Sequence, residues 1–172
     1  MQLMMERVDF PNTLENTSQK GELYMNRTRQ STHMAAAGWP NKFFYLIQFT
    51  WGLSANILGL LVFLCCRKRF SSEPFCNSIV TWLPGDLGGL SLGIFIFLSA
   101  HSAHERRRLC IHEYGHTVQC LFLGPLYWLV IVIPSVIWFH FFAGYRKKHH
   151  TPYDALYCEH WATAWGKRWS RL

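Results

Sequence analysis

Two long stretches without charge constrain this chain more than any other feature. No Asp, Glu, Lys or Arg occurs between Lys42 and Arg67, and none occurs between His116 and Arg146. A helix needs about 20 consecutive apolar residues to cross the hydrocarbon core of a bilayer. Residues 43–66, FFYLIQFTWGLSANILGLLVFLCC, reach that length, and residues 126–142 are shorter but strongly apolar. The sequence therefore predicts an integral membrane protein.

The composition points the same way. Half of the 172 residues are hydrophobic and only 16% are charged, against about 25% in soluble domains. The predicted fold is mainly α, a small polytopic membrane protein with about two to four membrane-embedded helices. Residues 1–42 are expected to form a polar, disordered tail and residues 43–69 a transmembrane helix with a basic flank. Residues 70–172 would form a membrane-embedded domain.

The basic residues gather beside the apolar segments. Twelve of the 17 lie in four clusters, at 67–69, 106–108 and 146–148 and at Lys167, Arg168 and Arg171. Basic residues that flank membrane segments stay on the cytoplasmic side and meet anionic lipid there. We therefore expect cytosolic basic loops and a lipid bilayer as partner. The net charge of +7 does not predict nucleic-acid binding, because no nucleic-acid motif accompanies it.

Residues 81–100, TWLPGDLGGLSLGIFIFLSA, allow two interpretations. The segment is apolar enough for a span, yet it contains Pro84, Asp86 and four glycines, with β-branched and aromatic residues after the glycines. Each glycine costs a helix about 1 kcal/mol. A single crossing would also place the cluster at 106–108 on the opposite side from 67–69. We favour a re-entrant or hairpin element, with a short β-hairpin before the following helix, over a membrane span.

Residues 112–116, HEYGH, match the HExxH pattern of zinc peptidases. Positions four apart on a helix differ in direction by about 40°, so His112 and His116 can bind one ion. Neutral imidazoles suit zinc, and a catalytic zinc site keeps one position open. Glu113 points in a different direction and could act as general base. The sequence predicts His112 and His116 as metal ligands and Glu113 as the catalytic residue.

Glu159 is the best candidate for the third ligand. It lies in PYDALYCEHWATAWG, where Asp154 is the only other charged residue. A carboxylate in an apolar helix needs a partner, and a metal ion would be one. If the chain turns at Gly124-Pro125 and returns by residues 146–148, Glu159 would lie at the same membrane depth as His112. Rival ligands remain open; these are Asp154, His149, His150 and His160. The spacing of His101, His104 and His140 along the chain gives no reason to expect them as metal ligands.

Three blocks in order resemble a known family. They are GDLGGLSLGIFIF, then HEYGHTVQCLFLGPLYWLVIVIPS, then YDALYCEHWATAWG, and together they cover about residues 83–166. They resemble a family of small, mostly uncharacterised bacterial membrane proteins with an HE[YF]GH, GPLY, PS and ExWA pattern. The last block also resembles the gluzincin pattern, in which a later glutamate completes HExxH. That pattern usually has an acidic residue four positions after the glutamate, and here the position is Thr163. The resemblance implies a bacterial cell membrane.

The combined prediction is an integral-membrane zinc metallopeptidase that hydrolyses peptide bonds near the cytosolic membrane surface. Peptides or membrane proteins would be its substrates, and Tyr153, Tyr157 or His160 could stabilise the oxyanion. Two other classes stay open. One is a non-catalytic membrane protein with a structural metal site. The other is a metal-free membrane interaction or transport subunit.

Overall fold

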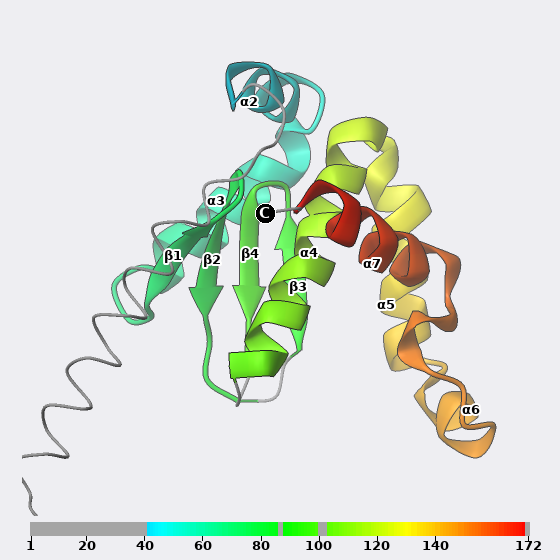
Figure 1. Cartoon of the computed structure of the whole chain (residues 1–172). Coiled ribbons are helices and arrows are strands. Elements are labelled where there is room, and N and C mark those ends of the chain that lie inside the picture. Colours follow the sequence, from blue (N-terminus) through cyan, green and yellow to red (C-terminus); the bar gives the residue numbers. More distant parts are fainter. Residues whose placement is uncertain (1–40, 86–87, 100–102, 171–172) are drawn as a thin grey trace, which may run out of the picture. The chain divides into compact units, whose positions relative to one another are not determined.

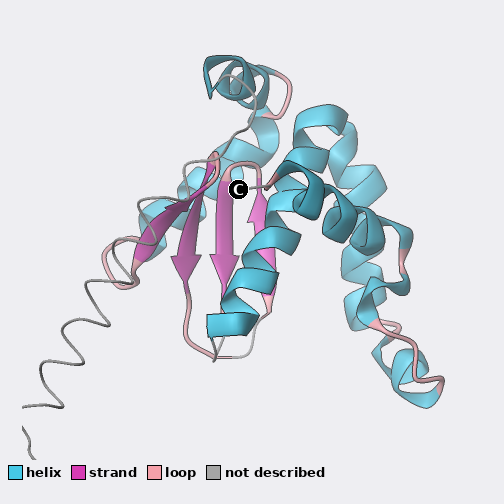
Figure 2. Cartoon of the chain, in the orientation of Figure 1, coloured by secondary structure: helices cyan, strands magenta, loops and turns pink. Residues whose placement is uncertain are grey.

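A four-stranded sheet lies at the centre of the protein, and this corrects the predicted mainly α, polytopic fold. The computed structural model describes residues 41–85, 88–99 and 103–170. These residues form a mixed α/β fold with six α-helices and four strands (Figures 1 and 2). The predicted polar tail, residues 1–42, lies outside the described residues except for its last two. The two central strands of the sheet are short β-branched and aromatic runs, SIVTW and FIFL, and turn residues border them, which favours strands over helix.

The sheet consists of two hairpins joined side by side. The strands are β1 (Ser72–Phe75), β2 (Ser78–Trp82), β3 (Gly89–Leu92) and β4 (Phe95–Leu98), in the order β1-β2-β4-β3. Both hairpins are antiparallel, and β2 pairs with β4 in parallel. The turn after β3 uses Gly93 at φ +65°, a left-handed conformation that suits glycine. The hairpin interpretation of residues 81–100 therefore holds for β3 and β4, and this segment is not a span.

The predicted 24-residue span is broken in two. Its residues form α2 (Asn41–Thr50) and α3 (Leu53–Cys66), bent by 95°. No single helix among the described residues is both long and apolar enough to cross a bilayer, and α2 and α3 pass that test only as a bent pair. The predicted second apolar segment, 126–142, contains only the shorter helix Trp128–His140.

Buried amides stabilise the bend. Asn56 donates to the backbone carbonyl oxygens of Gln48 and Gly52, each at 2.9 Å, and to the Gln48 side chain. These carbonyls lie at the break, where a helix end leaves acceptors without partners. Gln48 in turn donates to the backbone of Thr117 at 2.9 Å. The bend is therefore a specific hydrogen-bonded structure.

Helices cover the two faces of the sheet. α3 lies behind it and α4 (Ala103–Leu123) lies in front of it in Figure 1. Asn56 of α3 accepts from the backbone N–H of Ile94 at the β3–β4 turn. Phe44 of α2, Phe95 and Phe97 of β4 and Leu121 of α4 belong to one core cluster. This cluster packs the sheet and the last turn of α4 against the N-terminal helices.

The chain reverses after α4 as the sequence predicted. Gly124 has φ +53°, and with Pro125 it forms the predicted break. The chain continues through the π-helical turn η1 (Trp128–Val132), α5 (Ile133–His140), α6 (Ala143–Lys148) and the 3-10 turn η2 (Tyr153–Ala155). The final helix, α7 (Tyr157–Trp169), returns to pack along α4 (Figure 1).

Two glycines set the close packing of α4 on α7. A Cβ at Gly115 would collide with the backbone of Ala162, and a Cβ at Gly166 would collide with the backbone of Ile111. Any larger residue would push the two backbones apart. This close packing explains why residue 115, inside HEYGH, is a glycine. The HExxH pattern itself assigns no role to that position.

We predict that Gly115→Ala lowers the free energy of unfolding by about 2 kcal/mol, because overpacking forces backbone shifts. Zinc binding should weaken as well, since α7 carries Glu159. Thermal unfolding and zinc titration measure these effects. Gly144→Ala is the matched control, because nothing lies within 4 Å of a Cβ there. Equal stability of the two variants would contradict the packing argument.

Candidate metal centre

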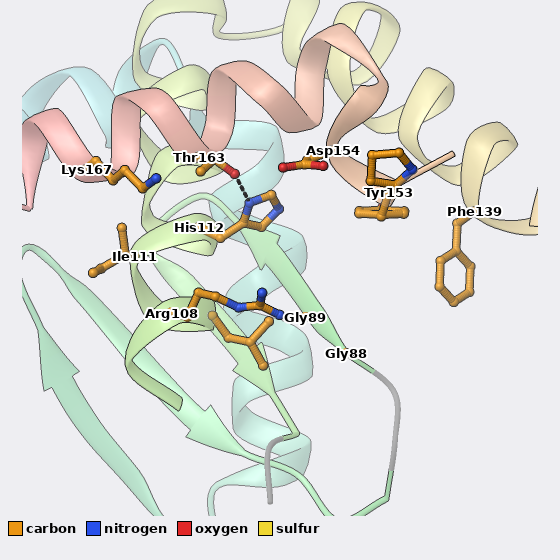
Figure 3. A pocket seen from close by; sticks show the side chains of 12 residues that line it. Gly88, Gly89, Arg108, Ile111, His112, Phe139, Tyr153, Asp154, Thr163 and Lys167 are labelled. Carbon is orange, nitrogen blue, oxygen red and sulfur yellow. Dashed lines mark hydrogen bonds between the residues drawn. The ribbon is translucent and has the colours of Figure 1, made fainter. Parts of the chain in front are cut away.

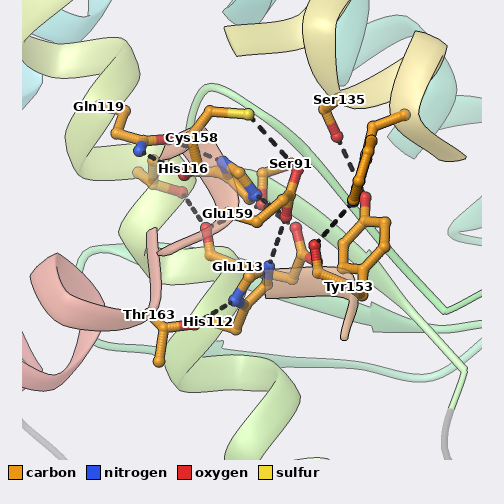
Figure 4. A network of polar contacts seen from close by, with 12 residues as sticks. Ser91, His112, Glu113, His116, Gln119, Ser135, Tyr153, Cys158, Glu159 and Thr163 are labelled. Carbon is orange, nitrogen blue, oxygen red and sulfur yellow. Dashed lines mark hydrogen bonds and ion pairs between the residues drawn. The ribbon is translucent and has the colours of Figure 1, made fainter. Parts of the chain in front are cut away.

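Two helices bring three potential ligands together. His112 and His116 come from one face of α4, and Glu159 comes from the first turn of α7 (Figure 4). Glu159 Oε2 lies 3.1 Å from Nε2 of His112 and 3.3 Å from Nε2 of His116. One potential ligand atom of each residue lies within 4.8 Å of the others. The group could hold a metal ion.

The electrostatics of the group favour positive charge between the helices. Glu159 is 1% exposed. Burial disfavours its charged form, yet hydrogen bonds from His112 and His116 outweigh burial and hold the pKa of Glu159 well below its usual range. Burial would lower the pKa of His116, but the carboxylates of Glu159 and Glu113 raise it above its usual value. A cation between these groups would meet a carboxylate that is already buried and ionised. Binding would therefore add no further cost of burying that carboxylate.

The outer nitrogen of each imidazole has its own partner. Nδ1 of His112 lies 2.9 Å from the Thr163 hydroxyl, and Nδ1 of His116 lies 2.7 Å from Oε1 of Gln119. Gln119 also donates to the backbone carbonyl of Cys158, next to Glu159. Such partners fix the ring orientation of metal-binding histidines. The gluzincin pattern has an acidic residue at the position of Thr163. Here the hydroxyl of Thr163 forms the hydrogen bond to His112 instead.

The general-base candidate points toward the sheet. Glu113 is 5% exposed, and its Oε2 accepts from the Ser91 hydroxyl at 2.7 Å. The same hydroxyl lies 2.8 Å from the backbone oxygen of Glu113. A Cβ at Gly89 would collide with the Glu113 carboxylate, so β3 leaves room for it only through a glycine. The GGLSLG block of the sequence contains both Gly89 and Ser91, although its pattern alone did not indicate contact with Glu113.

A cavity of about 620 Å³ opens beside His112 (Figure 3). The start of β3, both site helices and the segment before α7 line it. Tyr153 and Asp154 contribute to the wall, and the Tyr153 hydroxyl lies 3.1 Å from the hydroxyl of Ser135. His112 is partly exposed whereas Glu159 is buried, so the group is accessible from the His112 side. A substrate could reach the metal centre from this cavity.

The other residues that the sequence suggested as ligands or oxyanion stabilisers do not belong to the group of His112, His116 and Glu159. The Tyr157 hydroxyl donates to the backbone of Val130, and His160 is exposed. His149 and His150 are exposed at the end of α6, and His140 is exposed at the end of α5. Of the rival ligands, only Asp154 lines the cavity. His101 falls outside the described residues, as does the side chain of His104.

No family model, no curated protein and no solved structure matches the chain. The resemblance to bacterial membrane proteins therefore stays a prediction, and function has to be inferred from the geometry of the site.

We predict that Glu159→Ala reduces zinc affinity at least about tenfold, because it removes the charged ligand between the two histidines. Asp154→Ala is the control, since Asp154 is outside the ligand group although it lines the same cavity. Zinc stoichiometry and competition titration of the purified protein measure the difference. Normal zinc binding by Glu159→Ala would exclude Glu159 as the third ligand.

Proposed function

We propose that this protein is a zinc metallopeptidase that hydrolyses peptide bonds at a membrane surface. One observation carries the proposal. His112, His116 and Glu159 converge on one point, the charge of Glu113 acts on His116, and His112 lines a cavity. Two imidazoles and one carboxylate are a ligand set of catalytic zinc sites, which keep a further position for water or substrate. The oriented outer nitrogens also fit zinc.

The chain's own residues have distinct roles in this reaction. Zinc would supply Lewis acidity, which polarises the peptide carbonyl and favours ionisation of water. Glu113 accepts a proton from the attacking water as the water oxygen bonds to the carbonyl carbon. The same carboxyl then gives that proton to the amine nitrogen when the carbon–nitrogen bond breaks. Ser91 holds the carboxylate in place through its 2.7 Å hydrogen bond.

The edge strand β3 could hold the substrate. β3 is at the end of the sheet order, its first residue Gly89 lines the cavity, and Leu90 is 48% exposed. An extended peptide can add to such an edge through backbone hydrogen bonds. Zinc peptidases commonly present an edge strand beside the HExxH helix. This arrangement favours a peptide over other substrates with a hydrolysable carbonyl.

The alternative of a structural metal site has less support. It would need a fourth protein ligand such as His149 or His160, to close the coordination. Among the described residues, no other histidine, cysteine or carboxylate joins His112, His116 and Glu159 in a group that could hold a metal ion. The open cavity at His112 also favours catalysis. Zinc analysis of the purified protein tests the metal-free alternative.

The apolar helices support association with a bilayer. Large hydrophobic side chains stay exposed along α3, η1 and α5 and just after α5, including Leu61 at 56%, Leu129 at 64% and Phe141 at 79%. Basic residues follow at 67–69 after α3 and at 146–148 within α6. Exposed apolar surface of this extent, bordered by cations, is typical of membrane binding. The proposal places the basic segments at the cytosolic face of a bacterial membrane.

We predict that Glu113→Gln abolishes peptide hydrolysis while zinc remains bound at wild-type stoichiometry. The amide is nearly isosteric but cannot accept the proton. A fluorogenic peptide library measures hydrolysis and metal analysis measures zinc. Zinc loss as complete as in His112→Ala would show that the role given to Glu113 is wrong.

We predict that Tyr153→Phe lowers kcat about a hundredfold with little change in KM, if its hydroxyl stabilises the oxyanion. Among the three candidates only Tyr153 lines the cavity. Tyr157→Phe is the matched control and should keep wild-type kcat, because that hydroxyl binds Val130. A similar loss in both variants would exclude this role for Tyr153.

We predict that the full-length protein floats with vesicles that contain anionic lipid. Leu61→Asn combined with Leu129→Asn should reduce flotation, because both exposed side chains would lose their apolar contact with the acyl chains. Leu90→Asn is the control, since Leu90 is similarly exposed but lies on the edge strand. Flotation unaffected by the double variant would contradict membrane binding through these faces.

A further inference from the structure

The cavity beside the metal centre contains two cationic side chains that the proposed hydrolysis does not use. Arg108 and Lys167 both line it, together with His112 and Thr163 (Figure 3). Arg108 is four residues before His112 on α4, and Lys167 is four residues after Thr163 on α7. Each cation therefore lies on the site-facing side of its helix, about one turn or 5.4 Å from the His112–Thr163 hydrogen bond.

The helix packing brings together the stretches of α4 and α7 that carry the two cations. Gly166 fits against the backbone of Ile111, so Lys167 and Arg108 lie on either side of this close approach. Both side chains are exposed to solvent along the cavity. The cavity lining contains one carboxylate, Asp154, and Figure 3 shows it on the opposite side of Thr163 and His112 from Lys167. The cavity lining thus contains two cations and one carboxylate.

We propose that Arg108 and Lys167 bind a carboxylate of the peptide substrate. The inference rests on the proposed peptidase function and names its substrate class. Guanidinium groups bind carboxylates through paired hydrogen bonds, and lysine adds a second charge. Acidic peptides are therefore preferred over neutral ones.

The spacing limits where that carboxylate lies. One helical turn separates the cations from His112, and an extended chain advances about 3.3–3.6 Å per residue. The carboxylate therefore belongs to a residue within about two positions of the cleaved bond. It can be the C-terminal carboxylate of the peptide or the side chain of an acidic residue at that position. Both sources present the same chemical group, so the experiment uses a separate peptide for each.

The test measures peptide binding by calorimetry to zinc-loaded, full-length Glu113→Gln protein, which prevents turnover. Three N-acetylated alanine peptides serve as probes: one with a free C-terminus, one with a C-terminal amide, and one amidated with a terminal glutamate. Arg108→Gln with Lys167→Gln is the test pair. Arg107→Gln with Arg168→Gln is the control pair, with equal charge change and positions outside the cavity lining.

We expect the free-carboxylate peptide to bind about tenfold more tightly than the plain amide. The test pair should lose this preference and the control pair should keep it. If the glutamate amide also binds tightly, the side chain can supply the carboxylate; if it does not, the C-terminus is the source. Equal binding of all three peptides, no binding of any of them, or equal loss in both pairs overturns the inference.

Hydrolysis by the wild-type protein is measured separately. A carboxylate preference without any hydrolysis would overturn the peptidase function and leave this anion site standing. Hydrolysis without a carboxylate preference would overturn the anion site and leave the peptidase function standing.

Discussion

The contact between the backbones of α4 and α7 is the constraint on which the candidate site depends. Gly115 and Gly166 allow the helices to approach until only glycine fits at each position. That approach places Glu159 within hydrogen-bond distance of both histidines. It also aligns Thr163 with His112 and places Lys167 and Arg108 along one cavity. Ligands, ring orientation and the charge of the cavity thus follow from one packing interaction.

The sheet contributes a second, independent constraint. β3 supplies Ser91 to hold Glu113 and Gly89 to leave room for it. Tyr127, from the segment after α4, donates to the backbone of Ser91 at 3.1 Å and so fixes the strand from the other side. The metal group is held by α4 and α7, whereas the base is held by α4 and β3. A change in the sheet could therefore impair the proposed catalysis without affecting the proposed zinc binding.

Polar side chains within the apolar segments explain the departure from simple spans. Gln48 and Asn56 are 0% and 1% exposed, and each forms hydrogen bonds to backbone carbonyls. In an apolar environment these amides would be costly without partners, and a broken helix supplies carbonyls that need donors. The bend between α2 and α3 satisfies both groups at once. The apolar surface that remains exposed on these helices is the basis for the proposed membrane association.

The sequence by itself indicated the histidine pair, the adjacent base, Glu159 as their partner, and the break at Gly124-Pro125. These follow from helical spacing, from the cost of an isolated carboxylate and from the backbone of glycine and proline, all of which are local. Their metal-binding roles stay predictions. The mainly α, polytopic fold was wrong, because hydropathy reveals neither the four-stranded sheet nor the bend at Gln48, Gly52 and Asn56. The partners Ser91, Gln119 and Thr163, and the parallel pairing of β2 with β4, were decided only by the tertiary structure. They depend on contacts between segments distant in the chain, and no local pattern specifies which donor meets which acceptor.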